Sequence, residues 1–239
     1  MMARGAASLD AGRGRAVFVP ACAAMLLATP LWSEDFGPIP REACEPVYTV
    51  QKRGCEIDHV FLCEVDGERL VRIENIDLEE APSYSLKTMT GDTVFEWDEE
   101  NGPYLLGITE NRDPSSTATL LSEGADSVDQ DLTIRMPPFD TGDGSMSYVA
   151  EMTGAEISDN GVTFQEARAL GKIRAYTLEM DFVGYLYVDA ARDIVLEGEV
   201  TFLIDNLSQS YSGAPVTVAL PGEPGFLSDR PLFDCGELS

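Results

Sequence analysis

The chain has little positive charge. Its 239 residues include 16 lysine and arginine residues against 42 aspartate and glutamate residues, and the formal net charge is −26. Nucleic acids and anionic membrane surfaces repel such a chain, so the composition argues against both as partners. The acidic residues are spread along the sequence, as is typical of a solvated acidic surface, and they favour cations or a basic partner.

The chain also lacks the short motifs of several enzyme classes. It has no Gly-x-Ser-x-Gly elbow, no Ser-x-x-Lys motif and no Gly-Lys phosphate-binding loop. A hydrolase with a pair of carboxylates stays open, because 42 acidic residues offer many pairs, but no particular pair can be selected. The sequence therefore indicates no catalytic residue and no cofactor, and it leaves enzyme activity uncertain.

Long apolar runs are scarce, with one exception near the start of the chain. Arg13 and Arg15 precede an apolar run from Ala16 to Trp32, and an acidic region follows Ser33. This pattern predicts a secretory signal peptide over residues 1–33. The run is shorter than the roughly 20 residues of a membrane-spanning helix. We therefore predict a periplasmic or secreted protein that is not an integral membrane protein, with a single β-rich domain over residues 34–239.

Five cysteines are present, and one of them lies inside the predicted signal peptide. Cys22 does not follow the apolar run, which disfavours a lipoprotein. The other four are Cys44, Cys55, Cys63 and Cys235. An even number of cysteines in an exported chain predicts two disulfides, with three possible connectivities. A two-residue turn at Arg53-Gly54 would place Cys44 opposite Cys63, which favours that bond and leaves Cys55 for Cys235.

Two segments have part of the pattern of a metal site. Cys55-x3-His59-x3-Cys63 would place three ligands on one face of a helix, but its apolar residues favour a strand and its cysteines favour disulfides. Asp140–Ser145 has glycines and acids of a calcium loop without the spacing or the closing glutamate of an EF-hand. We predict a loop there, and no metal at either segment.

Apolar and polar residues alternate with period two along most of the chain, which predicts strands. Residues 176–204 show it best, with a loop at Asp189–Asp193. A second hairpin turns at Asn160-Gly161 and pairs Ile157 with Phe164. Roughly ten to twelve strands predict an all-β fold, a large curved antiparallel sheet resembling a half-barrel or open barrel. Helices are few and short, with one candidate at Gln165–Leu170.

The long hairpin holds the one feature that resembles a binding site. Pairing its two strands places Gly184 opposite Gly198, Phe182 opposite Val200, and Met180 opposite Phe202. Two facing glycines leave a notch in an apolar face. The notch is either a bend in the core, with room for an aromatic ring, or part of a ligand groove. The candidate ligand-binding residues are Gly184, Gly198, Phe182, Val200, Met180 and Phe202.

Cys55, His59 and Cys63, together with Pro221–Ser228 and the later Cys235-Gly, resemble uncharacterised exported proteins of proteobacteria. The resemblance covers two short segments and implies no activity. The leading hypothesis is a non-catalytic binding protein whose concave face takes up an apolar or lipid-like ligand or a segment of an envelope partner. The alternatives are an interaction module with a closed core and no small-molecule site, and a hydrolase that uses carboxylates.

Overall fold

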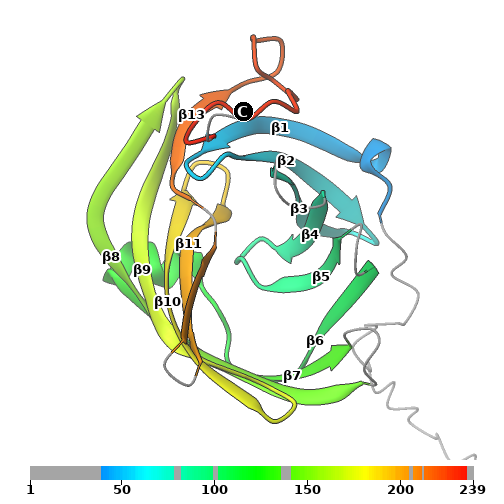
Figure 1. Ribbon diagram of the computed structural model, residues 1–239, viewed down its shortest axis with the longest axis vertical. Helices are drawn as coiled ribbons and strands as arrows, with labels where there is room; N and C mark the ends of the chain where they lie inside the picture. Colours follow the sequence, from blue (N-terminus) through cyan, green and yellow to red (C-terminus); the bar gives the residue numbers. More distant parts are fainter. Residues whose placement is uncertain are drawn as a thin grey trace, which may run out of the picture. The chain divides into compact units, whose positions relative to one another are not determined.

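The computed structural model describes residues 39–77, 82–98, 102–135, 141–204, 207–211 and 213–235. Thirteen strands form one antiparallel sheet in the order β12-β11-β10-β9-β8-β7-β6-β5-β4-β3-β2-β1-β13 (Figure 1). Neighbours in the sequence are therefore neighbours in the sheet, except that β13 returns to pair with β1. The predicted signal peptide lies outside the described residues.

The strands vary widely in length. The first seven are β1 (Cys44–Lys52), β2 (Glu56–Val65), β3 (Glu68–Asp77), β4 (Ser83–Thr88), β5 (Thr93–Asp98), β6 (Gly102–Asp113) and β7 (Ala125–Arg135). The remaining six are β8 (Gly142–Asp159), β9 (Val162–Ala175), β10 (Leu178–Asp189), β11 (Ile194–Ile204), β12 (Leu207–Tyr211) and β13 (Pro215–Ala219). A single turn of 3-10 helix, η1 (Arg41–Ala43), precedes β1.

The sheet curves round until β8–β11 face β1–β5 across its interior (Figure 1). β13 approaches the tip of the β8–β9 hairpin, where the Val218 backbone N–H donates to Asp159 Oδ2 at 2.7 Å. Within the described ranges no ladder joins the edge strands β12 and β13, so the sheet stays open. The prediction of an all-β fold with a large, open, curved sheet is confirmed.

One α-helix is present among the described residues, and it was not predicted from the sequence. α1 (Thr117–Glu123) begins at Ser116, whose hydroxyl accepts from the Thr119 N–H at 3.1 Å, and it ends at Gly124 in the left-handed conformation. The helix predicted at Gln165–Leu170 is wrong, because these residues belong to β9. Ladders with β8 and β10 satisfy the β9 backbone on both sides, and this tertiary pairing overrides the local preference.

The hairpin β10–β11 is present, but its predicted register is wrong. Val188 lies opposite Val195, and Gly184 lies opposite Val200 rather than opposite Gly198. Between these pairs the ladder shifts by one residue, because Gly198 and Glu199 together face Tyr185 in a β-bulge. The Asn160-Gly161 turn is as predicted: both residues have positive φ, and Ile157 pairs with Phe164.

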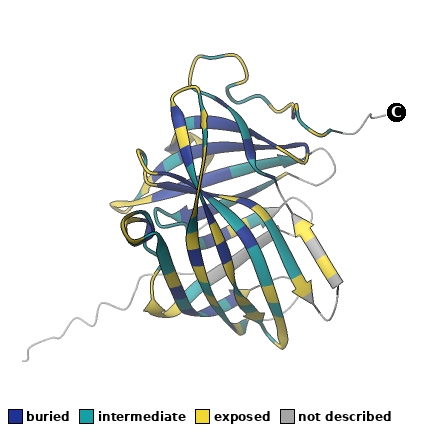
Figure 2. Cartoon of the chain, turned by 90° about the vertical axis from the view of Figure 1, so that its left-hand side faces the viewer, coloured by how far each residue is buried: buried dark blue, intermediate teal, exposed yellow. Residues whose placement is uncertain are grey.

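The bulge reverses which face of β11 each residue occupies. Before it, Ile194 and Leu196 are fully buried in a core cluster with Tyr48, whereas the buried Val195 belongs to a second cluster that includes Leu120 of α1. The start of β11 is therefore covered on both faces. Buried and exposed residues alternate along much of β9, whereas most residues of β1 and β2 are buried. Figure 2 shows how buried and exposed residues are distributed over the strands.

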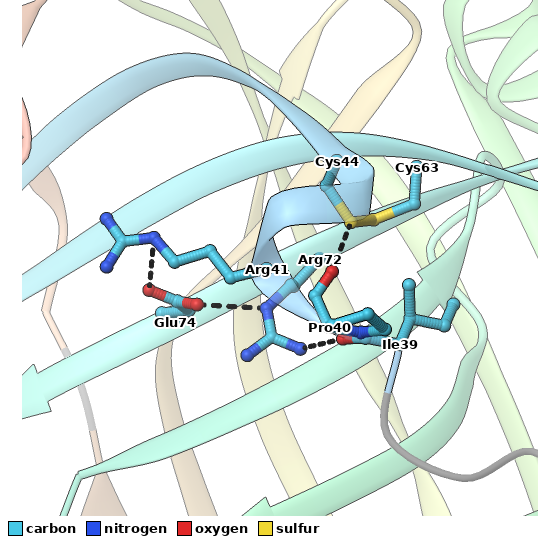
Figure 3. Close-up of a disulfide and its surroundings, with 7 residues drawn as sticks. All are labelled: Ile39, Pro40, Arg41, Cys44, Cys63, Arg72 and Glu74. Atoms are coloured by element: carbon cyan, nitrogen blue, oxygen red, sulfur yellow. Dashed lines mark hydrogen bonds and ion pairs between the residues drawn. A yellow bond between two sulfur atoms is a disulfide. The ribbon is translucent and has the colours of Figure 1, made fainter.

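Both predicted disulfides are present. Cys44–Cys63 joins β1 to β2 with a Cα–Cα distance of 4.3 Å. The turn between these strands has three residues, since Lys52 pairs with Glu56, and a register shift after Pro46 brings the two cysteines opposite each other. Beside this disulfide, Arg72 fastens the segment before β1: its Nη1 donates to the Ile39 carbonyl at 2.8 Å and its Nε to Glu74 Oε1 at 2.9 Å (Figure 3).

The second disulfide, Cys55–Cys235, fixes the C-terminal segment over β1 and β2. Buried polar side chains of these strands hold the segment along its length. The Leu227 N–H donates to Thr49 Oγ1 at 2.8 Å, and His59 Nε2 lies 2.9 Å from the Ser228 carbonyl oxygen. His59, which lies between Cys55 and Cys63 in the sequence, therefore has a structural role in holding the C-terminal segment. Cys55 and Cys63 are both in disulfides.

Candidate functional site

An apolar cavity of about 200 Å³ lies against the interior face of β7–β11, and we call it the apolar pocket. The ladders place alternate residues of neighbouring strands on this face; Gly184 pairs with Ala169, for example, and Phe182 with Phe202. The turn between β4 and β5 covers part of it. Its apolar and aromatic side chains come from Ile108, Leu132, Met146, Tyr148, Ala169, Ile173, Phe182, Tyr185, Leu186, Val195, Val200 and Phe202.

Five of the six residues proposed from the sequence line this pocket. They are Phe182, Gly184, Gly198, Val200 and Phe202, and Met180 is not among the lining residues. The two glycines do not form a shared notch. A Cβ atom on Gly198 would lie 2.3 Å from Cε2 of Tyr187, so an aromatic ring already occupies that side of Gly198. A Cβ atom on Gly184 would meet Val200 Cγ2 at 3.3 Å, beside the pocket.

A second cavity, of about 550 Å³, adjoins the first, and we call it the polar chamber. Its charged lining includes Lys52, Glu56, Asp58, Asp77, Lys87, Glu96, Glu197 and Glu199. Lys52 Nζ lies 3.3 Å from Glu56 and 3.2 Å from Asp58. Burial alone would lower the pKa of Lys52, but the two carboxylates outweigh it and raise that pKa above its usual value. The ammonium group therefore stays charged and paired.

The two cavities meet at an ion pair between Lys87 of β4 and Glu197 of β11. Both residues line both cavities, as do Gly198 and Val200. The Lys87 side chain is buried, whereas that of Glu197 is 59% exposed, so water reaches the carboxylate through the chamber. The positive charge of Lys87 lowers the pKa of Glu197 despite its position in the interior. The pair crosses the interior of the sheet and marks the boundary between apolar and polar linings.

A polar corner of the apolar pocket was not found from the sequence. Asp92 lies in the β4–β5 turn and is 7% exposed, and Gln130 on β7 is fully buried. Gln130 Nε2 donates to Asp92 Oδ1 at 3.2 Å, and the Thr90 hydroxyl donates to Asp92 Oδ2 at 3.3 Å. Both Asp92 and Gln130 line the pocket. We call these two side chains the acceptor corner, because both carry oxygen atoms that accept hydrogen bonds.

The turn geometry fixes Asp92 in this position. Its N–H donates to Thr88 Oγ1 at 3.0 Å, while its carbonyl accepts from the Thr88 N–H at 2.9 Å. Gly91 has a φ of 96°, and a Cβ atom there would lie 3.1 Å from Val195, so the turn fits closely against β11. Burial raises the pKa of Asp92, an effect that the hydrogen bonds from Gln130 and Thr90 oppose. No short sequence pattern indicates the contact between Asp92 and Gln130, because these residues are 38 positions apart in the chain.

The segment considered as a calcium loop has a different structure. Asp140 lies outside the described residues, whereas Asp143, Gly144 and Ser145 belong to β8 and pair with β7. The predicted loop is therefore strand from Gly142 onward. In the described part of the chain, no group of three or more histidine, cysteine, aspartate or glutamate side chains is arranged to hold a metal ion.

Comparisons with known protein families, with curated proteins and with solved structures find no match for this chain. No helix among the described residues has the length and apolar character needed to cross a membrane. The two disulfides indicate a non-reducing environment outside the cytoplasm. The function therefore rests on the geometry of the two cavities.

Proposed function

We propose that the protein is an exported, non-catalytic binding protein that takes up an apolar or lipid-like molecule in the apolar pocket. The observation that carries the proposal is the pocket itself, a cavity walled by aromatic and aliphatic side chains on the interior face of an open sheet. Ligand sites are mostly apolar concavities with a few polar groups that fix orientation. The acceptor corner is such a polar group.

The size of the pocket restricts the ligand. Its volume of about 200 Å³ is below the roughly 300–1,000 Å³ of sites for drug-sized molecules. A short chain or a small ring system fits inside it. A longer molecule would extend past Lys87 and Glu197 into the polar chamber, where its far end could remain hydrated.

The proposal also includes export through the predicted signal peptide, to the periplasm or beyond the cell. Residues 1–33 would be removed and Glu34 would become the new N-terminus. N-terminal sequencing of the exported protein tests this part, and Met1 or Met2 at the start of the exported chain would contradict it.

Native mass spectrometry of protein purified from its own compartment tests the binding function. We expect a bound apolar molecule, released on unfolding, and uptake of diphenylhexatriene by ligand-free protein with a rise in fluorescence. Protein that carries no ligand and takes up no dye would support the alternative of an interaction module with a closed core.

A further inference from the structure

The acceptor corner contains a buried carboxylate that forms no ion pair, although the charge of Lys87 acts on it from a longer range. Asp92 receives two neutral hydrogen bonds, from Gln130 and Thr90, and none of the ion pairs among the described residues includes it. Buried charges in proteins are normally paired or bound to a metal, because an unpaired charge is costly to remove from water. A buried, unpaired carboxylate in the wall of an apolar pocket therefore lacks a partner that a ligand can supply.

Gln130 gives a second, independent indication. Its Nε2 is used by Asp92, but its Oε1 is buried and accepts no hydrogen bond from any described residue. Unsatisfied buried acceptors are rare, because each loses its hydrogen bond to water. The ladder pairs Gln130 with Met146, and both residues line the pocket. The corner thus offers a carboxylate and an amide oxygen, and each of them needs a donor.

The cation in the pocket lining is already used. Lys87 is the lysine or arginine among the lining residues, and it pairs with Glu197. An acid-headed ligand would meet the carboxylates of Asp92 and Glu197 without an unpaired cation to receive it. The charge and the hydrogen-bonding chemistry of the lining therefore agree in favouring a donor with positive charge.

We propose that the ligand of the apolar pocket is an amphiphile whose polar end is a protonated amine, held by Asp92 and by the Oε1 atom of Gln130. The inference rests on the proposed binding function and specifies its ligand class. An ammonium group carries up to three donors, so it can satisfy both acceptors at once. An alcohol has a single donor and no charge, and it satisfies one of them.

Competition among matched ligands tests the inference on the unmodified protein. Decylamine, decanol and decanoate share one apolar chain and differ in the head group, and each is titrated against protein loaded with diphenylhexatriene at neutral pH. We expect decylamine to bind at least about tenfold more tightly than decanoate, with decanol between them, because the amine can satisfy both buried acceptors, the alcohol only one and the carboxylate neither. Equal affinities, or a preference for decanoate, would overturn the amine.

Two variants separate the corner from the acidic surface. Asp92→Asn is expected to weaken decylamine binding about tenfold while leaving uptake of the dye, which has no donor, unchanged. Asp143→Asn removes the same charge from an exposed position on β8 and should change neither. An equal loss of decylamine affinity in both variants would show attraction by the net charge alone and would refute the site.

A third comparison guards against simple loss of structure. Gln130→Met removes the free acceptor, and Gln51→Met removes another buried glutamine, one that holds the C-terminal segment through Arg230 and Leu232. We expect the decylamine preference to fall in the first variant alone. Protein that binds none of these compounds and no dye would refute the proposed function itself, whereas dye uptake without an amine preference would refute this inference alone.

Discussion

Filling the pocket at Gly184 should weaken binding at little cost in stability. Gly184 lies on β10 opposite Val200, and a Cβ atom there would meet Val200 Cγ2 at 3.3 Å. A few tenths of an ångström of movement by Val200 relieves this contact. Val200 also lines the pocket, so it has space to move. The side chain introduced by Gly184→Leu would then occupy the cavity.

The expected magnitudes follow from two opposing effects. Burying a leucine side chain contributes about 1.5–3 kcal/mol. Overpacking costs about 1–3 kcal/mol. The two nearly cancel, so we expect the free energy of unfolding to change by less than about 1.5 kcal/mol. Binding responds differently, because a leucine side chain removes a large part of a 200 Å³ cavity. Affinity for diphenylhexatriene should fall at least about tenfold, which corresponds to about 1.4 kcal/mol of binding free energy.

Gly198→Ala is the matched control. Its Cβ atom would lie 2.3 Å from Tyr187 Cε2, and Tyr187 is 3% exposed and donates from its hydroxyl to Glu166. This ring has no cavity to enter, so we expect a loss of about 1–3 kcal/mol of stability. Urea denaturation and dye titration of both variants give the comparison. A large loss of stability in Gly184→Leu with unchanged dye binding would refute the pocket and the proposed function.

Three further predictions concern charge and cross-linking. Burial raises the pKa of Asp92 above 3.8, so its charged form destabilises the fold at neutral pH. Asp92→Asn should therefore raise the melting temperature, by an amount that shrinks as the pH falls toward 3.8. A lower melting temperature of this variant at neutral pH would contradict the prediction. Lys87 lowers the pKa of Glu197 below 4.5, so the charged pair stabilises the fold at neutral pH. Because solvent exposure weakens the pair, Glu197→Gln should lower the free energy of unfolding by only about 1 kcal/mol. The difference in stability between the two proteins should vanish as the pH falls below 4.5. Removing the Cys55–Cys235 bond, which spans 180 residues, by a double serine substitution should lower the free energy of unfolding by up to about 5 kcal/mol, and unchanged urea denaturation would argue against a stabilising cross-link.

Most of the features that the sequence predicted correctly depend on local patterns; the Cys55–Cys235 disulfide followed instead by elimination once Cys44 was paired with Cys63. Period-two alternation identified the all-β class, and Asn160-Gly161 identified a hairpin because both positions favour positive φ. The pairing of Cys44 with Cys63 was also correct, although the turn is one residue longer than predicted. Two irregularities compensate there: the longer turn shifts the register, and the bulge after Pro46 restores it.

The register of the long hairpin was not predictable in the same way. Matching apolar residues across β10 and β11 favours a continuous ladder without a bulge. The observed ladder instead contains an extra, unpaired residue at Gly198-Glu199. A bulge has little sequence signal beyond the glycine. A regular ladder would form the predicted notch, and the bulge removes it. Five of the six predicted residues still line the pocket, because past the bulge Val200 and Phe202 lie on the same face as Gly184 and Phe182.

The acceptor corner depends on contacts that no local pattern encodes. Asp92 and Gln130 are 38 residues apart, and they meet because the sheet curves the β4–β5 turn onto β7. In the sequence, Asp92 looks like an ordinary turn residue, and Gln130 looks like an ordinary polar residue of a strand. Burial without a full set of partners distinguishes them, and burial is a property of the folded chain.

The bulge also explains how one strand serves two cavities of opposite character. Before the bulge, Val195 and Glu197 of β11 lie opposite Val188 and Leu186. After it, Val200 and Phe202 lie opposite Gly184 and Phe182. In a regular strand, Glu199 rather than Val200 would follow Glu197 on this face. The extra residue removes a second carboxylate from the apolar wall and leaves Glu197 at the boundary, where Lys87 pairs with it. The junction between the polar chamber and the apolar pocket therefore follows from a single irregularity in the ladder, placed where the interior changes from charged to apolar.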